Sequence, residues 1–389
     1  MTKVLEQQIA VFGESGSGKT VLLSSFFGPT EEEGFGERNL FEVVADDAGQ
    51  GATLFQNFLG MRNSARVPDP NKFRSTSYSF SIRKAKGLPA SAGPGATFDA
   101  VRLVWHDYPG EWFEQDVAGE EADRRVEVFR TLLGSDVAVL LVDAQRLIDN
   151  EGQEEAYLKA LFYNYRVGIE NLRERILDDG KPLTVFPRIW IVALSKSDLL
   201  PDTDVHRFKE LVIEKSAGDL NRFRATIASM VDAPSALAVG EDFLLLSSAK
   251  FSPGHIELTQ RVGVDLMLPI AAVLPLERHV QWINSKKLPH AVAEKLLENA
   301  GIITTALIAV APFLLKVRLP GPLALLAPLL TRALSKDALE KFVDLGRAKL
   351  EEVRKQALKH HDYLTAVLTR FRIDLEDAEK NKTLLRSLK

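Results

Sequence analysis

Residues 9–20 read IAVFGESGSGKT, four apolar residues followed by a glycine-rich loop with the spacing G-x-x-x-x-G-K-T. Apolar positions resume at Val21, Leu22 and Leu23, as they do on one face of a helix. Strand, loop and helix are the context in which this spacing forms a P-loop, the Walker A motif. Its glycines let backbone N–H groups turn toward phosphate oxygens, and the helix N-terminus adds a positive dipole. The stretch predicts an α/β fold with a phosphate-binding loop after a strand.

The end of this loop carries the most specific expectations. Lys19 is expected to contact the β- and γ-phosphates and, as a catalytic residue, to neutralise charge there, while the Thr20 hydroxyl binds Mg²⁺. A glycine-rich turn without a ligand has no need of Lys-Thr at its end. The residues expected to contact the nucleotide phosphates are Gly13, Glu14, Ser15, Gly16, Ser17, Gly18, Lys19 and Thr20.

Further along the chain, a strand and helix pattern repeats as far as about residue 285. Unbroken apolar runs at residues 137–142, 189–194 and 243–246 are typical of parallel strands covered by helices on both faces. Helical patterns at residues 154–177 and 205–216 lie between them. We therefore expect a mostly parallel sheet flanked by helices, of the P-loop NTPase type.

The region after the first helix has a different character. Residues 28–72 are rich in glycine, acidic residues and turn formers, which predicts a long irregular segment. Residues 78–82 alternate like a half-exposed strand and are expected to pair with residues 101–105 across a Gly/Pro-rich turn.

Residues 107–110, DYPG, follow that second strand. The Asp107 carboxylate is expected to hold the water shell of the metal opposite Thr20, and Gly110 to offer its N–H to a γ-phosphate. Taken alone, the tetrapeptide is an ordinary strand-to-loop turn. Its place in an ordered series of motifs favours the functional interpretation.

Two later segments, SKSD at residues 195–198 and SSAK at residues 247–250, come directly after apolar runs. Guanine presents N1–H and N2–H₂ donors on one edge, so a carboxylate there accepts two hydrogen bonds, whereas adenine leaves the charge unsatisfied. Asp198 is the candidate acceptor, and the Lys196 stem would cover the ring. The residues expected at the base end are Ser195, Lys196, Asp198, Ser248, Ala249 and Lys250, with the Ala249 N–H meeting the guanine carbonyl.

These four segments resemble the motifs GxxxxGK[ST], DxxG, [NT]KxD and SA[KL] of Ras-like GTPases of the translation-factor-related (TRAFAC) class. The string DYPGEW at residues 107–112 is most similar to the YcjX-like GTPases. The resemblance covers roughly the first 250 residues. It implies binding of GTP and GDP with Mg²⁺, slow GTP hydrolysis and switching between two states.

The sequence departs from that pattern in three places. Ser195 stands where the family has Asn or Thr. Glu111 stands where a glutamine orients the attacking water; as the catalytic residue there it would face the γ-phosphate charge, so we expect slow intrinsic hydrolysis. The threonine that closes over Mg²⁺ has no sharp motif, and Thr76 is the best placed. Arg74 beside it is interpreted as a surface arginine, with an arginine finger in cis as the alternative.

Composition narrows the function classes. The chain has 389 residues, 46% hydrophobic and 26% charged, which is ordinary globular composition. A formal net charge of -4 gives no overall attraction to nucleic acid, and zero cysteines fit a reducing compartment. Residues 1–8 carry charge and amides where a secretion signal has an apolar stretch, so we expect a cytoplasmic protein.

We place a domain boundary at residue 287, with a Ras-like GTPase domain before it and a helical module at residues 288–389. Residues 300–334 are very apolar, but Lys316 and Arg318 interrupt them, and each central charge costs about 2.5–3.5 kcal/mol in a membrane. Three interpretations stay open: two buried core helices, a hairpin that inserts shallowly at a membrane surface, or an interface with a protein partner or a second copy. The charged tail that follows predicts amphipathic helices.

The histidines are given structural interpretations. His106 precedes Asp107 directly, so strand alternation points it away from the aspartate, and we interpret it as a packing or surface residue. His360, His361 and Asp362 are adjacent on a helix pattern and diverge in direction, which indicates a surface cluster and not a metal site.

The sequence thus favours a GTP-binding switch that signals through its C-terminal helices to a membrane surface or a protein partner. Two other classes stay open. A P-loop ATPase or nucleotide kinase would keep the glycine loop but would not need Asp198. A nucleotide-binding scaffold would bind without turnover.

Overall fold

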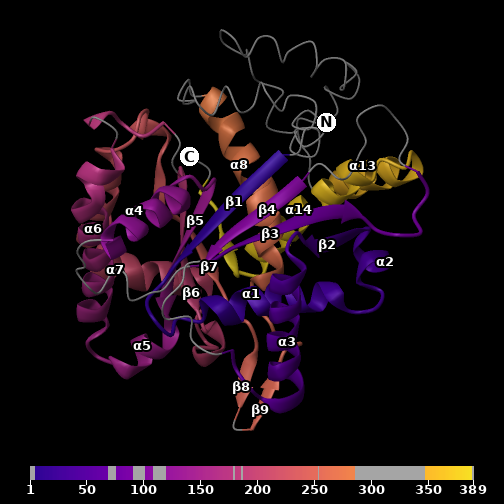
Figure 1. Cartoon of the computed structure of the whole chain (residues 1–389), viewed down its shortest axis with the longest axis horizontal. Coiled ribbons are helices and arrows are strands. Elements are labelled where there is room, and N and C mark those ends of the chain that lie inside the picture. The colour runs from indigo at the N-terminus through magenta and orange to yellow at the C-terminus, as the bar shows by residue number, and fades with distance from the viewer. Residues whose placement is uncertain are drawn as a thin grey trace.

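A computed structural model describes residues 5–68, 76–90, 101–107, 120–177, 180–184, 187–252, 254–284 and 347–387 (Figure 1). Its strands are β1 (Leu5–Phe12), β2 (Phe41–Ala45), β3 (Thr76–Lys84), β4 (Val101–Asp107), β5 (Val137–Asp143), β6 (Ile189–Ser195), β7 (Ala238–Leu245), β8 (Lys250–Ser252), β9 (His255–Glu257) and β10 (Leu384–Leu385). Its helices are α1 (Lys19–Phe27), α2 (Phe35–Asn39), α3 (Ala48–Ser64), α4 (Glu120–Leu133), α5 (Ala144–Asp149), α6 (Glu154–Ile176), α7 (Val205–Ala228), α8 (Met267–Asn284), α13 (Arg347–Lys359) and α14 (Tyr363–Lys380).

Eight strands of the described part form one sheet in the order β10-β7-β6-β5-β1-β4-β3-β2. Strands β4, β1, β5, β6 and β7 are parallel, and β2, β3 and β10 are antiparallel to their neighbours. The predicted fold class, a mostly parallel sheet flanked by helices, is confirmed. β1 lies between β4 and β5, where the strand order reverses, and ligands of open α/β sheets bind beyond the carboxyl ends of the strands at such a point. The glycine loop follows β1 at this position.

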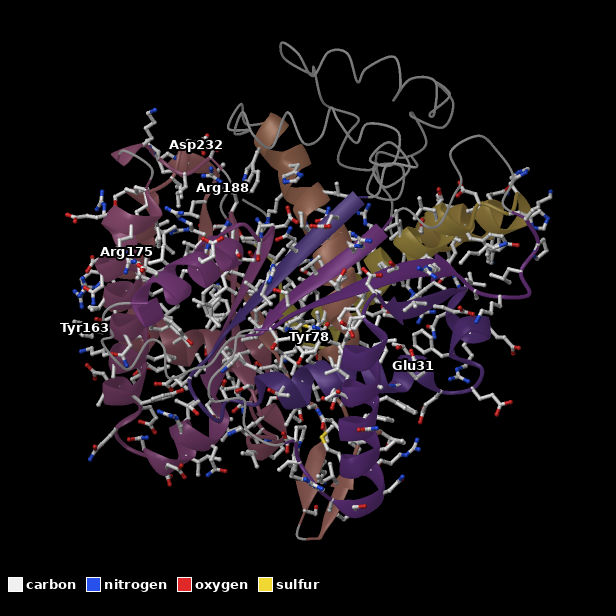
Figure 2. The ribbon with its side chains drawn as sticks, in the orientation of Figure 1. Glu31, Tyr78, Tyr163, Arg175, Arg188 and Asp232 are labelled. Atoms are coloured by element: carbon white, nitrogen blue, oxygen red, sulfur yellow. The ribbon has the colours of Figure 1, made fainter. Side chains whose placement is uncertain are left out.

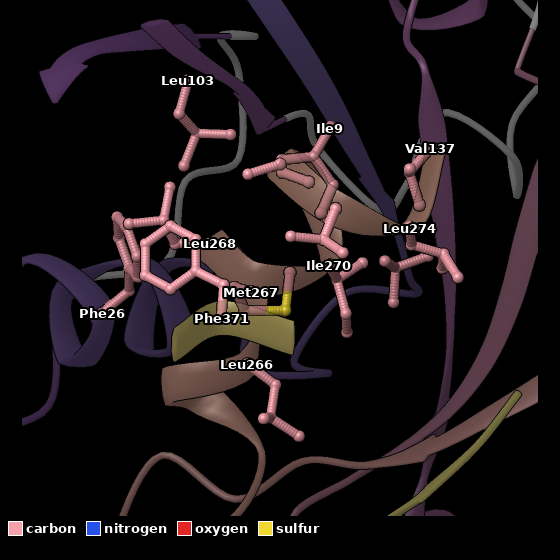
Figure 3. Packing of buried hydrophobic residues seen from close by; sticks show 14 of the residues in the cluster. Ile9, Phe26, Leu103, Val137, Leu266, Met267, Leu268, Ile270, Leu274 and Phe371 are labelled. Atoms are coloured by element: carbon pink, nitrogen blue, oxygen red, sulfur yellow. The ribbon is translucent and has the colours of Figure 1, made fainter. Parts of the chain in front are cut away.

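Alternation along the strands divides the core between the two faces of the sheet. Ile9 and Val11 of β1 belong to one buried cluster, with residues of α1, α8 and α14, while Ala10 and Phe12 belong to another, with residues of α4, α6 and α7. Figure 3 shows the first cluster, in which Phe371 of α14 lies close to α8 residues beneath β1. Burying each such side chain contributes about 1.5–3 kcal/mol, so both helical layers hold β1 and its loop in place.

The prediction of an irregular segment over residues 28–72 is wrong. This region contains α2, β2 and the 17-residue helix α3. The Asp47 side chain caps α3 by accepting a hydrogen bond from the Gln50 N–H, and its buried side chains include Leu54, Phe58 and Met61, spaced four and three residues apart. The helical period was present in the sequence, but the surrounding glycines and polar residues obscured it.

The predicted pairing of residues 78–82 with residues 101–105 is confirmed as the antiparallel ladder of β3 and β4. Strand β10 has no counterpart in the sequence analysis, which found no strand after residue 287. It pairs antiparallel with β7, Leu384 opposite Leu244. Two residues are too short a run to carry a period-two pattern.

Residues 285–346, and with them the apolar stretch 300–334, lie outside the described residues, so the boundary at residue 287 stays a prediction. The described part beyond it packs closely with α13 against α14 and α14 against α8. None of the helices in the described ranges combines the length and the apolarity that a membrane span needs.

Strand β6, which leads into the predicted base-binding loop, is anchored at its start by a buried arginine. Arg188 is 3% exposed and forms an ion pair with Asp232, and Figure 2 shows the two side chains together. Trp190 within the strand donates its indole N–H to the Pro187 carbonyl at 2.7 Å. These contacts fix the amino end of the strand whose other end carries Ser195 and Lys196.

Candidate nucleotide-binding site

A cavity of about 410 Å³ lies at the carboxyl ends of the central parallel strands. Its volume is within the range of small-molecule sites, about 300–1,000 Å³. It is lined by Ser15, Gly16, Ser17, Gly18, Lys19, Thr20, Val21, Leu22, Val67, Pro68, Leu141, Gln145, Ser195, Lys196, Asp198, Leu199, Leu246, Ser248 and Phe251. Two segments about 180 residues apart in the sequence, at Lys19 and at Asp198, therefore line the same cavity.

The backbone of the glycine loop adopts a shape that only glycine accepts readily. Gly16 and Gly18 have φ of 81° and 90°, in the left-handed region. A Cβ added at Gly13 would lie 2.4 Å from Ser17 Oγ, so a side chain there would require the Ser17 hydroxyl to move. Lys19 is 8% exposed, and its Nζ donates to the Gly13 and Glu14 carbonyls at 2.7 and 3.1 Å. The loop thus surrounds the Lys19 ammonium with its own backbone, which is the position of the lysine in a P-loop.

Arg146, for which the sequence motifs predict no role, contacts the glycine loop from outside. Arg146 Nη1 lies 3.2 Å from Glu14 Oε2, and its Nη2 is 3.4 Å from the Ser15 carbonyl. Arg146 belongs to α5, whose first turn also supplies Gln145 to the cavity. Glu14 therefore links the glycine loop to α5 through this ion pair. Its contact with the nucleotide phosphates stays a prediction.

Lys196 adopts a left-handed backbone with φ of 54°, and its Nζ lies 2.7 Å from Asp143 Oδ2. Asp143 is 3% exposed and caps α5 through the Gln145 N–H at 2.9 Å. The Tyr157 hydroxyl accepts a hydrogen bond from the Asp143 N–H, and burial beside Glu14 raises the pKa of Tyr157, so the phenol stays protonated. Asp143 was not predicted; an acidic residue at the end of an apolar strand is the signal that could have found it.

Asp198 is positioned by the neighbouring loop. Ser247 Oγ lies 2.7 Å from Asp198 Oδ1 and 2.8 Å from the Ala249 carbonyl, and the Ser197 N–H donates to the Leu246 carbonyl at 3.0 Å. These bonds join the two predicted base-end loops to each other. Asp198 is among the residues that line the cavity.

The base end also carries exposed apolar surface. Val67 is 49% and Phe251 39% exposed, and both line the cavity with Leu199. Apolar side chains that gather at one end of a cavity are typical of small-molecule sites. A planar aromatic ring fits such a wall, so this end suits a nucleobase and the glycine loop suits phosphates.

The other predicted base-end residues take different positions. Ser195 and Ser248 line the cavity, and Ser195 Oγ donates to the Val142 carbonyl at 3.3 Å. Ala249 is fully buried in a cluster with Phe58 and is not among the lining residues. Lys250 is exposed at the start of β8 and does not line the cavity.

At the metal end, Thr20 lines the cavity at the start of α1. Asp107 ends β4, beside β1 in a parallel ladder, so its backbone reaches the same edge of the sheet as the glycine loop. Thr76 is the register partner of Asp107 across β3 and β4, although it is not a lining residue. The Asp107 side chain and the predicted catalytic residues Gly110 and Glu111 lie outside the described residues.

This donor set fits Mg²⁺ bound together with a nucleotide, because one hydroxyl, phosphate oxygens and waters suffice for that ion. The described ranges contain no group of three histidine, aspartate or glutamate side chains able to hold a metal alone. His360 and His361 form no such site there. His106 is 4% exposed, with Nδ1 2.8 Å from Ser77 Oγ and Nε2 3.3 Å from Gln8 Oε1; its role is packing.

Sheet order, glycine loop and cavity together define a protein of the α/β P-loop NTPase-like class. No protein-family model matches the sequence, and no curated protein matches it. Among solved structures, a chain from an oligomerised bacterial dynamin pair, described as a mechanism for long-range sensing and tethering of membranes, aligns with 97% of this chain and 69% of its own length. The identity is 14% and the TM-score 0.27, and a likeness at that level supports no statement about function.

Proposed function

We propose that this protein binds guanine nucleotides in the 410 Å³ cavity and slowly hydrolyses GTP to GDP and phosphate. The observation that carries the proposal is the shared cavity: Lys19 of the glycine loop and the Asp198 carboxylate line one space. A P-loop alone is compatible with any nucleoside triphosphate. A carboxylate at the opposite end favours guanine, because it accepts two hydrogen bonds from N1–H and N2–H₂.

The phosphate end is assigned to the glycine loop. The Lys19 ammonium would exchange its bonds to the Gly13 and Glu14 carbonyls for phosphate oxygens, which carry more negative charge. Thr20 would hold Mg²⁺, with Asp107 and Thr76 as the further candidates. When bound, the ion neutralises charge that develops on the phosphate oxygens. Gly110 is assigned to the γ-phosphate and Glu111 to the attacking water.

The base end is assigned to three features. Asp198 reads the guanine edge, the Lys196 stem lies along the ring, and Phe251 and Val67 cover its apolar surface. The Lys196–Asp143 ion pair supports this role. It holds the Lys196 ammonium 2.7 Å from Asp143 Oδ2, and the aliphatic part of the side chain stays beside the cavity. Ser195, Ser248, Ala249 and Lys250 stay candidates for contacts to the base and sugar.

We further propose that the protein acts as a switch. The C-terminal helices carry the state of the bound nucleotide to a membrane surface or a protein partner. The packing of α14 on α8, which packs in turn on β1, supports a mechanical connection between the sheet and these helices. Which surface they engage is a separate question from nucleotide binding.

A titration with fluorescent GDP, GTP and ATP tests the central proposal. We expect guanine nucleotides to bind more tightly than ATP, and Lys19→Ala to weaken GDP about 10- to 100-fold by removing charged hydrogen bonds. Tyr163→Ala, at an exposed position of α6 that does not line the cavity, is the control. Equal affinities for ATP and GTP would favour the ATPase or nucleotide kinase class instead.

Single-turnover hydrolysis separates the switch from a scaffold. Protein with GTP and Mg²⁺ bound is expected to release phosphate slowly and stoichiometrically. Nucleotide that stays bound for hours as GTP would favour the scaffold. Flotation of the full-length protein with liposomes tests the membrane surface; protein that fails to float would leave a protein partner.

A further inference from the structure

The last described residues of the chain, 381–387, form a segment that we call the C-terminal tail. The Lys382 carbonyl accepts a hydrogen bond of 2.9 Å from the Val205 N–H, and Lys382 Nζ lies 3.1 Å from Asp204 Oδ2. Asp204 caps α7, the helix that follows the loop carrying Asp198. The tail therefore holds the end of the first base-contacting loop.

The same tail also holds the start of the second base-contacting loop. The Thr383 carbonyl accepts from the Leu245 N–H at 2.9 Å, and Leu384, 1% exposed, pairs with Leu244 on the edge of the sheet. Leu245 is followed directly by Leu246, Ser247 and Ser248, which supply two cavity residues and the hydroxyl on Asp198.

Ion pairs fix the other side of the tail to α8 and α14. Arg386 is bonded to Glu277 of α8 at 2.7 Å and to Glu379 of α14 at 2.5 Å. The Ser387 N–H donates to Asp242 Oδ1 at 2.7 Å, and Asp242 is paired with Arg278 of α8. Asp242 and Arg278 are both buried, so separating them would leave an uncompensated charge behind.

We propose that the C-terminal tail is the positioning element of the base end, and that it links guanine selectivity to α8 and α14. This inference rests on the proposed guanine site. Asp198 reads the base edge only if its carboxylate stays within a few tenths of an ångström of its place, and the supporting residues set that placement. The tail bonds to both loop roots, and none of its residues lines the cavity, so its residues act by position and not by contact with the nucleotide.

The tail would also connect the base end of the cavity to the positions of α8 and α14. Coupling between two sites is reciprocal, so an event that pulls α8 or α14 away from the tail would lower the preference for guanine. In the same way, a bound guanine nucleotide would hold the tail, α8 and α14 together more firmly.

The test compares GDP with IDP, whose base lacks the N2 amino group, in the full-length protein. Wild type is expected to prefer GDP by about 10-fold or more, the worth of a hydrogen bond to a charged group. Leu384→Asp places a charge in the buried β10 position and is expected to reduce that ratio to about 3-fold or less. Affinity for tripolyphosphate, which reads the glycine loop alone, should stay within about twofold, because its charged contacts are unchanged.

Leu132→Asp is the matched control, since Leu132 is also 1% exposed but lies in α4, in the core cluster on the face of the sheet opposite α8 and α14. It should keep the wild-type GDP-to-IDP ratio. If the aspartate variants do not fold, Leu384→Ala and Leu132→Ala make the same comparison with a smaller shift. An unchanged ratio in the Leu384 variant, or an equal fall in the Leu132 variant, would overturn the inference. A wild type that binds GDP and IDP equally would overturn the guanine assignment first, and the inference with it.

Discussion

At the scale of single residues, the base end is defined by polar groups that are already held in place. The Ser247 hydroxyl has one hydrogen and lies near two acceptors, Asp198 Oδ1 and the Ala249 carbonyl. It therefore orients the Asp198 carboxylate while leaving acceptor capacity for the two donors of guanine. Lys196 is held in place as well, by its ion pair with the buried Asp143. Prior orientation of this kind reduces the entropy that binding would otherwise cost.

Phe251 is expected to contribute to binding through the base and not through the phosphates. Stacking between an aromatic side chain and a nucleobase is worth about 1–3 kcal/mol, so Phe251→Ala should weaken GDP about 5- to 150-fold. Tripolyphosphate affinity should not change. Tyr163→Ala removes an aromatic ring that is 53% exposed outside the cavity and serves as the control. Isothermal titration calorimetry measures both; equal loss for GDP and tripolyphosphate would show that Phe251 acts on the fold instead.

His106 is expected to make stability depend on pH. Burial lowers its pKa from the ordinary 6.5 to about 4, so the folded protein holds the neutral ring while the unfolded chain takes up a proton as pH falls below 6.5. The contribution of His106 to the free energy of unfolding is then fully present above about pH 6.5. It decreases as pH falls toward 4, by about 2 kcal/mol between pH 7 and pH 5. Urea unfolding at both pH values measures it. In His106→Gln this contribution should be absent, and an identical slope in the variant would contradict the assignment.

At the scale of elements, the C-terminal part of the chain is joined to the sheet by charges in an otherwise apolar interior. Asp242 of β7 is fully buried, and burial raises the pKa of its carboxyl, while Arg278 of α8, 1% exposed, compensates the charge. Glu277, which directly precedes Arg278 in α8, forms an ion pair with Arg386 of the tail. α8 is therefore attached to both the sheet and the tail by neighbouring residues, which restricts its orientation.

Breaking the Asp242–Arg278 pair from one side is expected to destabilise the protein strongly. Arg278→Met would leave the Asp242 charge buried without its partner and lower the free energy of unfolding by about 3–5 kcal/mol. The double variant Asp242→Asn with Arg278→Met removes both charges and should recover most of the loss. Equilibrium unfolding in urea measures both variants. A double variant no more stable than the single one would show that packing, and not the unpaired charge, is responsible.

The elements also show which parts of the structure could be predicted from sequence. Strands β5 and β6 were evident because residues 137–142 and 189–194 are unbroken apolar runs buried on both faces, and the glycine loop because its spacing is rare. Helix α3 was missed because glycines at Gly49, Gly51 and Gly60 weaken its local signal, while tertiary burial of Leu54 and Met61 supports it. The Lys196–Asp143 and Ser247–Asp198 contacts join residues 53 and 49 positions apart, and no local pattern reports such pairs.

At the scale of the whole molecule, the sheet brings distant segments to one edge. β1 and β6 are both parallel neighbours of β5, so the loops after them open on the same side. Two helical layers cover the faces of the sheet (Figure 1). The cavity lies at the carboxyl ends of its central parallel strands. The nucleotide would therefore contact both the first strand's loop and the later loops of the same sheet.

A ligand that spans these loops is expected to stabilise the whole fold. Binding to the folded state alone adds about 2.7 kcal/mol at a ligand concentration 100 times Kd. GDP with Mg²⁺ should therefore raise Tm, and ADP at the same concentration should raise it less. Differential scanning fluorimetry measures both shifts, and Lys19→Ala should reduce the GDP shift to about half or less, in line with its 10- to 100-fold weaker binding. Equal shifts with GDP and ADP would mean that the base end does not discriminate.

The most direct test exchanges the base that the cavity accepts. Xanthine carries a carbonyl where guanine has its N2 amine, so an amide matches its edge: the carbonyl of the amide accepts from N1–H and its NH₂ donates to O2. We predict that Asp198→Asn binds XDP more tightly than GDP, while wild type prefers GDP over XDP, with both proteins binding tripolyphosphate equally. If wild type and Asp198→Asn had the same preference between GDP and XDP, Asp198 would not read the base, and the guanine-nucleotide function proposed for this protein would be contradicted.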